Sequence, residues 1–242
     1  MSRFIELLDR VREHSPRPAG FAAKTRNFDD FALIAQALPE ELVKDPLLAD
    51  IEVDAFLLQL GSVDHPNLAE AAKALGNHIW GVHLPLFTLE QTRFLVDIGC
   101  DFVIFDAAGT EAALLTLPDL GIVITVDHRS DEGIVRALSE LAINGLLFRP
   151  AIHESPLSFH TLANIQRVCG IIDRPLLLQL PEGACDTDLE VLRSVEATGL
   201  IVDVPPAKRA ASVRRCIEDL PPRSESRMVQ RAMQFSVGDS EL

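Results

Sequence analysis

The sequence predicts an α/β protein, a single-domain TIM (βα)8 barrel with an extra helix before the first strand and a tail after the last helix. Near-continuous apolar runs recur along the chain, helix-patterned segments separate them, and most runs end on a polar residue. Runs without polar alternation are typical of strands buried on both faces, as in a parallel sheet. Parallel neighbours joined through helices indicate repeated strand–helix units.

Seven of the expected strands are apolar runs of four to seven residues. They are 54–60, 79–84, 101–106, 122–127, 145–150, 175–180 and 200–204. An eighth strand is needed at the front, and the candidate is 18–24, followed by a helix within 28–38. This candidate is rich in alanine and poor in β-branched residues. The alternative is a doubly wound open sheet, but the Gly-rich turn that such a fold carries after its first strand is missing.

Helix boundaries follow from capping residues. Thr88 and Gln91 have the spacing of a capping box, and Gly99 is a stop signal. The same signals recur as Thr187, Glu190 and Gly199, and as Ser130 with Gly145. Residues 2–14 carry apolar side chains at helical spacing, which predicts an amphipathic helix covering the bottom of the barrel.

One barrel domain is expected over 1–222, with a tail over 223–242. The tail has few large apolar residues, too few to stabilise a helix alone. We expect it to be mobile, or ordered only against a second copy of the chain or a protein partner.

Composition excludes several classes of protein. The net charge is −14, which disfavours binding to nucleic acid or to an anionic membrane. The first residues lack a signal-peptide pattern, so a cytoplasmic protein is expected. The cysteines are far apart and include no C-x-x-C pair, so neither a metal nor a cofactor is predicted. They are Cys100, Cys169, Cys185 and Cys216.

The first polar residue after each apolar run marks the carboxyl end of a strand. In a barrel all these ends meet at one opening (the mouth), where active sites of TIM barrels are built. The expected ring is Lys24 with Arg26, Gln59, His83, Asp106, Asp127 with His128, Arg149, Gln179 with Glu182, and Asp203. An alternative is that the strand-end acids only cap the following helices. Thr110 and Ser130 weaken that reading for Asp106 and Asp127, because both are placed to cap the helices themselves.

The ring suggests proton-transfer chemistry on an anion. Lys24, Asp127, Asp106 and His83 are the catalytic candidates, with Lys24 and Asp127 as the main proton carriers. Arg149 is suited to clamp a carboxylate or a phosphate. Arg26, Gln59, His128, Gln179 and Asp203 are further candidates for substrate binding. A divalent metal on the acids and a histidine is chemically feasible, but no ligand spacing supports it.

The chain resembles the ribulose-phosphate-binding barrels, especially the indole-3-glycerol phosphate synthase family. The resemblance lies in the leading helix, in "GCDFVIFDAAG" (99–109) and in "LGIVITVDHRSDEGIVRALSELAINGLLFR" (120–149). It implies that Asp127 matches that family's strand 5 glutamate and Lys24 its first lysine, whereas His83 stands near its strand 3 lysine. The glycine loops that hold phosphate there are lost, so the resemblance implies the fold and not synthase activity.

Two functions are therefore expected. The first is a lyase or isomerase acting on a small anionic metabolite at the mouth. The second is a non-catalytic barrel that serves as a scaffold or regulatory subunit for a protein partner.

Overall fold

The computed structural model describes residues 2–14, 30–149, 156–184, 186–204 and 206–220. The strands are β1 (Ala32–Ala37), β2 (Ala55–Gln59), β3 (Trp80–His83), β4 (Phe102–Asp106), β5 (Gly121–Asp127), β6 (Gly145–Arg149), β7 (Leu176–Gln179) and β8 (Gly199–Asp203). The helices are α1 (Arg3–His14), α2 (Pro39–Lys44), α3 (Leu68–Leu75), α4 (Leu89–Asp97), α5 (Glu132–Glu140), α6 (Phe159–Cys169), α7 (Asp186–Ser194) and α8 (Ala207–Glu218). Two short 3-10 helices, η1 (Pro46–Asp50) and η2 (Ala112–Thr116), complete the elements.

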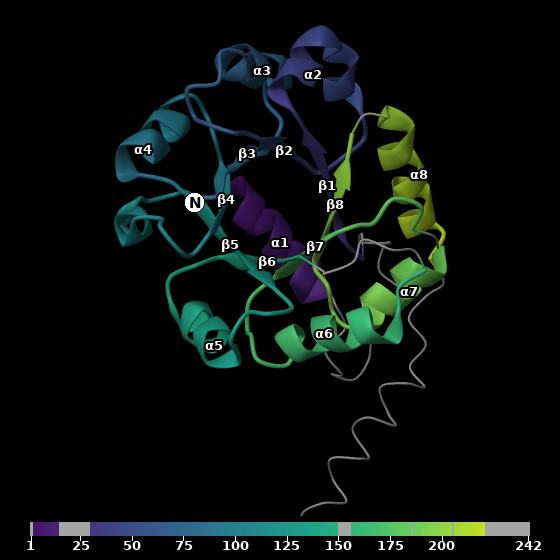
Figure 1. Ribbon diagram of the computed structural model, residues 1–242. Helices are drawn as coiled ribbons and strands as arrows, with labels where there is room; N and C mark the ends of the chain where they lie inside the picture. The colour runs from purple at the N-terminus through teal and green to yellow at the C-terminus, as the bar shows by residue number, and fades with distance from the viewer. Residues whose placement is uncertain (1, 15–29, 150–155, 185, 205, 221–242) are drawn as a thin grey trace, which may run out of the picture.

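The eight strands form a closed parallel barrel in chain order, as expected from the sequence. The barrel closes where β1 pairs with β8, with Ala32 opposite Gly199. Figure 1 shows the helices arranged around the strands and α1 crossing the barrel axis. The fold is therefore a TIM barrel, with every strand directed towards one mouth.

The hydrophobic core has two layers, one on each face of the sheet. Side chains such as Leu33 and Val103 face outward and pack under the surrounding helices. Ile34 and Ile104 face inward and pack with Phe4 and other residues of α1 inside the barrel. Burial on both faces explains why the strands read as continuous apolar runs.

Helix α1 closes the bottom of the barrel, as predicted. Its Phe4 ring stacks on Phe102 of β4 with ring centroids 3.8 Å apart. Phe4 and Leu8 are fully buried, so the apolar stripe of the helix is the face that fills the barrel.

The prediction for the front of the barrel was wrong. The segment 28–38 was expected to be a helix, but it contains β1, and the strand predicted at 18–24 lies outside the described residues. Ala32, Leu33, Ile34 and Ala35 are all fully buried. Burial at consecutive positions is typical of a strand between two neighbouring strands, whereas an amphipathic helix exposes one face to solvent. This tertiary setting overrides the weak strand propensity of alanine.

The capping signals had mixed outcomes. Thr88 Oγ1 accepts the N–H of Gln91, and the Gln91 side chain accepts the N–H of Thr88, so the predicted capping box at α4 is confirmed. Gly99 follows the end of α4 with a φ of +93°, a backbone conformation that favours glycine. The other caps differ. Helix α7 begins at Asp186, so Thr187 lies inside it, and α5 and α7 end at Glu140 and Ser194, well before Gly145 and Gly199, which open strands β6 and β8.

Candidate functional site

The polar ends of the strands form an inward-facing row at the mouth. Side chains alternate between the two faces of a strand, so residues two positions beyond an inward-facing core residue also face inward. Asp106 follows Phe102 and Ile104 in this way, and Gln59 follows Ala55 and Leu57. The complete row is Gln36, Gln59, His83, Asp106, Asp127, Arg149, Gln179 and Asp203, in which all but Gln36 are the last residues of their strands.

Gln36 is a site residue that the sequence analysis missed. It occupies the place in strand 1 that was expected for Lys24 and Arg26, because β1 lies further along the chain than predicted. Lys24 and Arg26 precede β1 in the sequence and lie outside the described residues. The available signal was the spacing of two between Ala32, Ile34 and Gln36, which is typical of one face of a strand, whereas the sequence analysis predicted a helix for this segment.

Arg149 and His83 meet across the mouth. The Arg149 Nη2 atom lies 2.5 Å from Nε2 of His83, although β6 and β3 are separated by two other strands. His83 is only 6% exposed. Its burial, reinforced by the nearby Arg149 charge, lowers the pKa of His83 to about 4. The ring is therefore neutral near pH 7 and accepts a hydrogen bond from the guanidinium.

The Arg149 charge is not neutralised by an acid within the described part of the chain. Asp127 is its register partner on β5, yet no ion pair joins them. The Asp127 Oδ1 atom instead accepts the backbone N–H of Arg129 at 2.7 Å and the hydroxyl of Ser130 at 3.1 Å. Partial burial acts to raise the pKa of Asp127, but these hydrogen bonds and the nearby His128 outweigh it and lower the pKa below its usual value.

Asp127 therefore stabilises its own turn, which corrects two expectations about capping. Ser130 donates to Asp127 and does not cap α5, since the cap of α5 is Asp131, which accepts the N–H of Ile134. Thr110 also caps no helix. Its hydroxyl donates to the backbone carbonyl of Asp106 and accepts the N–H of Phe87.

Asp106 differs from Asp127 because its carboxylate is free of side-chain hydrogen bonds among the described residues. Its register partner on β5 is Thr125. The Thr125 hydroxyl oxygen is buried, and it too has no hydrogen-bond partner within the described ranges. This sector of the mouth thus holds a half-buried acid and an unused hydroxyl side by side.

The opposite sector of the mouth is a closed network of amides around Asp203. Gln36 Nε2 donates to Asp203 Oδ1 at 2.8 Å and to Gln59 Oε1 at 3.1 Å. Gln179 Nε2 donates to the same Asp203 oxygen at 3.1 Å. Arg209 of α8 lies 3.5 Å from the other oxygen of Asp203, so this acid is held from two sides.

His128 lies at the turn after β5, next to Asp127. Its Nε2 accepts from Nε of Arg129 at 3.3 Å, and its carbonyl oxygen accepts from Nη2 of Arg167 on α6 at 2.9 Å. Nδ1 of His128 is buried and has no hydrogen-bond partner among the described residues.

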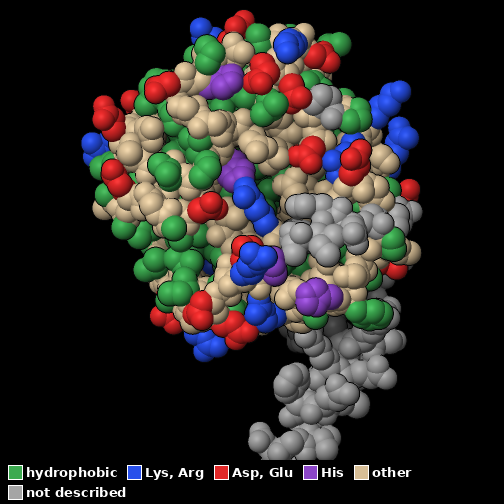
Figure 2. Space-filling model, in the orientation of Figure 1, with side chains coloured by type: hydrophobic (Ala, Val, Ile, Leu, Met, Phe, Trp, Pro, Cys, Tyr) green, Lys and Arg blue, Asp and Glu red, His purple; other side chains and the backbone are tan. Residues whose placement is uncertain are grey.

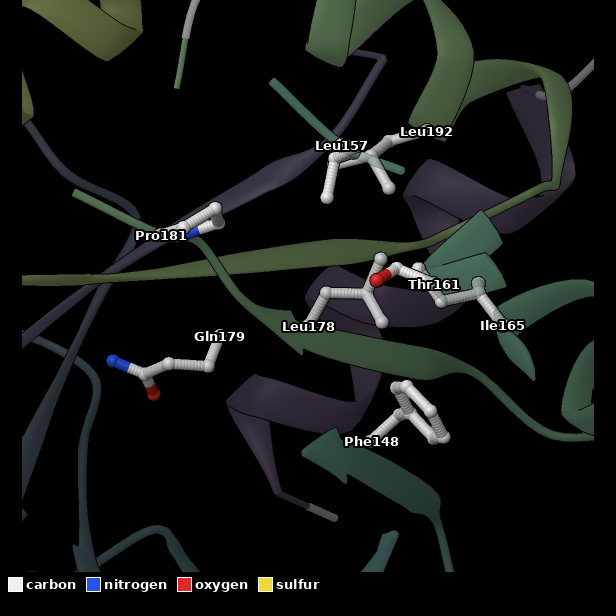
Figure 3. A pocket seen from close by; sticks show the side chains of 8 residues that line it. All are labelled: Phe148, Leu157, Thr161, Ile165, Leu178, Gln179, Pro181 and Leu192. Carbon is white, nitrogen blue, oxygen red and sulfur yellow. The ribbon is translucent and has the colours of Figure 1, made fainter. Parts of the chain in front are cut away.

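A small pocket lies outside the barrel wall, beneath α6 and α7 (Figure 3). Its walls are mostly apolar and include Phe148, Ile165 and Leu192. Gln179 lines it as well, but in Figure 3 its amide points away from the apolar side chains. The enclosed space holds about one water molecule, so it offers no room for a substrate.

The described residues offer neither a metal-binding cluster nor a membrane-spanning helix. Among them, no group of three or more His, Cys, Asp and Glu side chains is arranged to hold a metal ion. None of the described helices combines the length and the apolar character needed to span a membrane.

The sequence matches no family model and no curated protein. Solved structures share the fold. A mutant tryptophan synthase alpha subunit from the hyperthermophile Pyrococcus furiosus has a TM-score of 0.57 at 11% identity, over 80% of this chain and 99% of that one. Ligand-free tryptophan synthase from M. tuberculosis with a mutation in TrpA has a TM-score of 0.58 at 13% identity, over 91% and 96%. The aminoacrylate-bound form gives 0.58 at 14%, over 91% and 95%. The closed barrel and these likenesses together establish that the chain has the TIM-barrel fold found in tryptophan synthase alpha subunits.

Proposed function

We propose that this protein is a lyase or isomerase that binds a small anionic metabolite at the mouth of the barrel. The observation that carries the proposal is Arg149, a half-buried cation held by a neutral histidine and not by an acid. A guanidinium in this setting keeps its charge and its remaining N–H donors for a ligand. Carboxylates and phosphates are the groups that match its geometry.

Asp106 is the acid that we assign to proton transfer. Its carboxylate has no competing hydrogen bond from a described side chain, so it is free to meet a substrate proton. Asp127 is less suited, because the hydrogen bonds in its turn lower its pKa and hold it ionised. His83 supports the proposed site by holding Arg149. Lys24 and Arg26 precede β1 in the sequence, and they remain candidates for catalysis and for substrate binding, respectively.

The fold likeness supports the class of reaction only in a general way. The similar structures are alpha subunits of tryptophan synthase, and a shared fold does not assign their reaction to this chain. An alpha subunit is one part of an assembly, which gives weight to the second candidate, a non-catalytic subunit. The observation that favours this alternative is the Asp203 network, in which Gln36 and Gln179 both donate to Asp203 and Gln36 also donates to Gln59.

Purified full-length protein tests both functions. Native mass spectrometry of the protein as isolated should reveal a bound acid or phosphate ester, and thermal shift with a panel of such anions should identify a class that stabilises the fold. Arg149→Gln should abolish the stabilisation, whereas Arg136→Gln should not, because Arg136 is an exposed arginine on α5. Asp106→Asn should keep binding and lose turnover.

Absence of any anion effect in the wild-type protein would overturn the enzyme proposal. A stoichiometric protein that co-purifies with an anion-free barrel would support the subunit alternative.

A further inference from the structure

Arg129 and Arg149 each have a guanidinium group that contacts a histidine ring and not an acid. Arg149 donates to the ring of His83 and Arg129 donates to the ring of His128. Neither forms an ion pair within the described part of the chain, although the sequence has 36 acidic residues against 22 basic ones. Six other arginines pair with acids, namely Arg3, Arg12, Arg167, Arg193, Arg209 and Arg214. Four further arginines of the described part of the chain, Arg93, Arg136, Arg174 and Arg215, also form no ion pair, so what sets Arg129 and Arg149 apart is their contact with a histidine ring.

The two groups belong to neighbouring strand ends. Arg149 is the last residue of β6 and stands opposite Asp127 in the strand register. The backbone N–H of Arg129 donates to the Asp127 carboxylate at 2.7 Å, which fixes the backbone of Arg129 in the turn directly after β5. Figure 2 shows Lys or Arg side chains beside His side chains near the centre of this face, with an acidic side chain next to one of them.

The turn that carries Arg129 is itself held in place. Arg167 reaches from α6 to the carbonyl oxygen of His128 and also lies 3.6 Å from Glu132. Arg167 is thus occupied with structure and with an acid, whereas the side chain of Arg129 is exposed and has only a histidine ring as its described partner.

Support by an imidazole has a clear electrostatic consequence. A carboxylate would cancel the charge of the guanidinium, but an imidazole ring carries no negative charge and leaves the guanidinium charge in place. Two uncancelled cations on adjacent strand ends create a positive potential in a protein whose net charge is −14. The one acid between them, Asp127, has Oδ1 turned into hydrogen bonds with its own loop.

We infer that the ligand of the mouth is a dianion, a phosphate monoester or a dicarboxylate, with Arg149 and Arg129 each binding one charge. Arg129 is then the residue that distinguishes dianions from monoanions. This inference rests on the proposed anion site at Arg149 and adds the charge of the ligand to it.

Calorimetric titration of the full-length protein at pH 7.5 and constant ionic strength tests the inference. The probes are two matched pairs, succinate with propionate and methyl phosphate with dimethyl phosphate. The wild-type protein should bind the dianion of at least one pair roughly fivefold tighter than its monoanion, the scale of one partly exposed charge contact. The pair that shows the preference identifies the source of the charge as carboxylate or phosphate.

The variants separate this inference from the proposed function. Arg129→Gln should remove the preference for the dianion and leave monoanion binding unchanged. Arg149→Gln should abolish binding of both, and Arg136→Gln should change neither. Asp127→Asn should tighten dianion binding, because it removes a repulsive charge.

A wild-type protein without a preference, or an Arg129→Gln variant that keeps it, would overturn the dianion inference while the site at Arg149 stands. Loss of all anion binding in the wild-type protein, or binding that survives Arg149→Gln, would instead overturn the proposed function and this inference with it.

Discussion

Asp101 and Phe4 are 97 positions apart in the chain, yet the backbone N–H of Phe4 donates to the Asp101 carboxylate at 2.7 Å. The same carboxylate accepts the Arg3 N–H at 3.0 Å and the Ser2 hydroxyl at 2.7 Å. An acid at the amino end of β4 thus supplies the N-terminal cap of α1, whose first N–H groups would otherwise lack partners. The contact anchors the helix that fills the bottom of the barrel.

Removing this cap should destabilise the whole domain. We expect Asp101→Ala to lower the free energy of unfolding by about 1–2 kcal/mol, the cost of losing a helix N-cap. Urea unfolding followed by the fluorescence of Trp80, the one tryptophan of the sequence, measures it. Asp97→Ala is the control, because Asp97 is exposed, and it should change the stability by less than about 0.5 kcal/mol. Equal stability of the two variants would show that α1 does not need Asp101.

His83 should make the stability of the protein fall as the pH decreases. Its pKa is about 4 in the folded protein against 6.5 when unfolded, so the unfolded state binds more protons between these values. The contribution is complete above pH 6.5 and is lost as the pH falls towards 4. Between pH 7.5 and pH 5 the loss should be about 2 kcal/mol by this linkage.

Urea unfolding at several pH values checks the His83 prediction. His83→Gln should flatten the pH dependence, whereas His160→Gln, at an exposed position of α6, should leave it as in the wild-type protein. An unchanged slope in His83→Gln would contradict the burial of a neutral ring at this site.

Gly81 permits the close approach of β3 to β4. A Cβ atom at this position would lie 2.4 Å from the carbonyl oxygen of Phe102 and 2.6 Å from its ring. Gly81→Ala should therefore cost about 3 kcal/mol, the upper end for an overpacked core. Gly61→Ala, where a Cβ meets no atom within 4 Å, should be neutral in the same unfolding experiment. A Gly81→Ala protein as stable as the wild type would mean that the two strands separate easily.

The hydroxyl of Thr125 should lower the stability of the fold and contribute to ligand binding. Its buried hydroxyl has no hydrogen-bond partner among the described residues, so Thr125→Val should raise the free energy of unfolding by about 1 kcal/mol. If the mouth binds an anionic metabolite, the same change should weaken binding. Thr116→Val serves as the comparison, because the Thr116 hydroxyl donates to Ala113 and is exposed, and it should bring no gain. A loss of stability in Thr125→Val would show that the hydroxyl is satisfied.

The sequence by itself determined seven of the eight strands and the direction in which their polar ends face. The runs ending at Asp106, Asp127 and Arg149 are legible because a strand buried on both faces must be apolar until it leaves the core. The period of two along a strand then turns the terminal polar residue towards the barrel axis. Helix α1 could also be recognised from the sequence, because the face that it buries is a stripe of apolar residues at helical spacing.

Only the tertiary structure decided which segment forms strand 1 and which side chains contact one another at the mouth. The segment that forms β1 has little strand propensity, and it becomes a strand because β2 and β8 offer hydrogen bonds on both sides and the barrel must close. Arg149 donates to the buried ring of His83 across the barrel axis and forms no ion pair with its register neighbour Asp127, whose Oδ1 accepts hydrogen bonds from Arg129 and Ser130. Partners of this kind depend on closure of the whole barrel, which brings together residues that no local pattern connects.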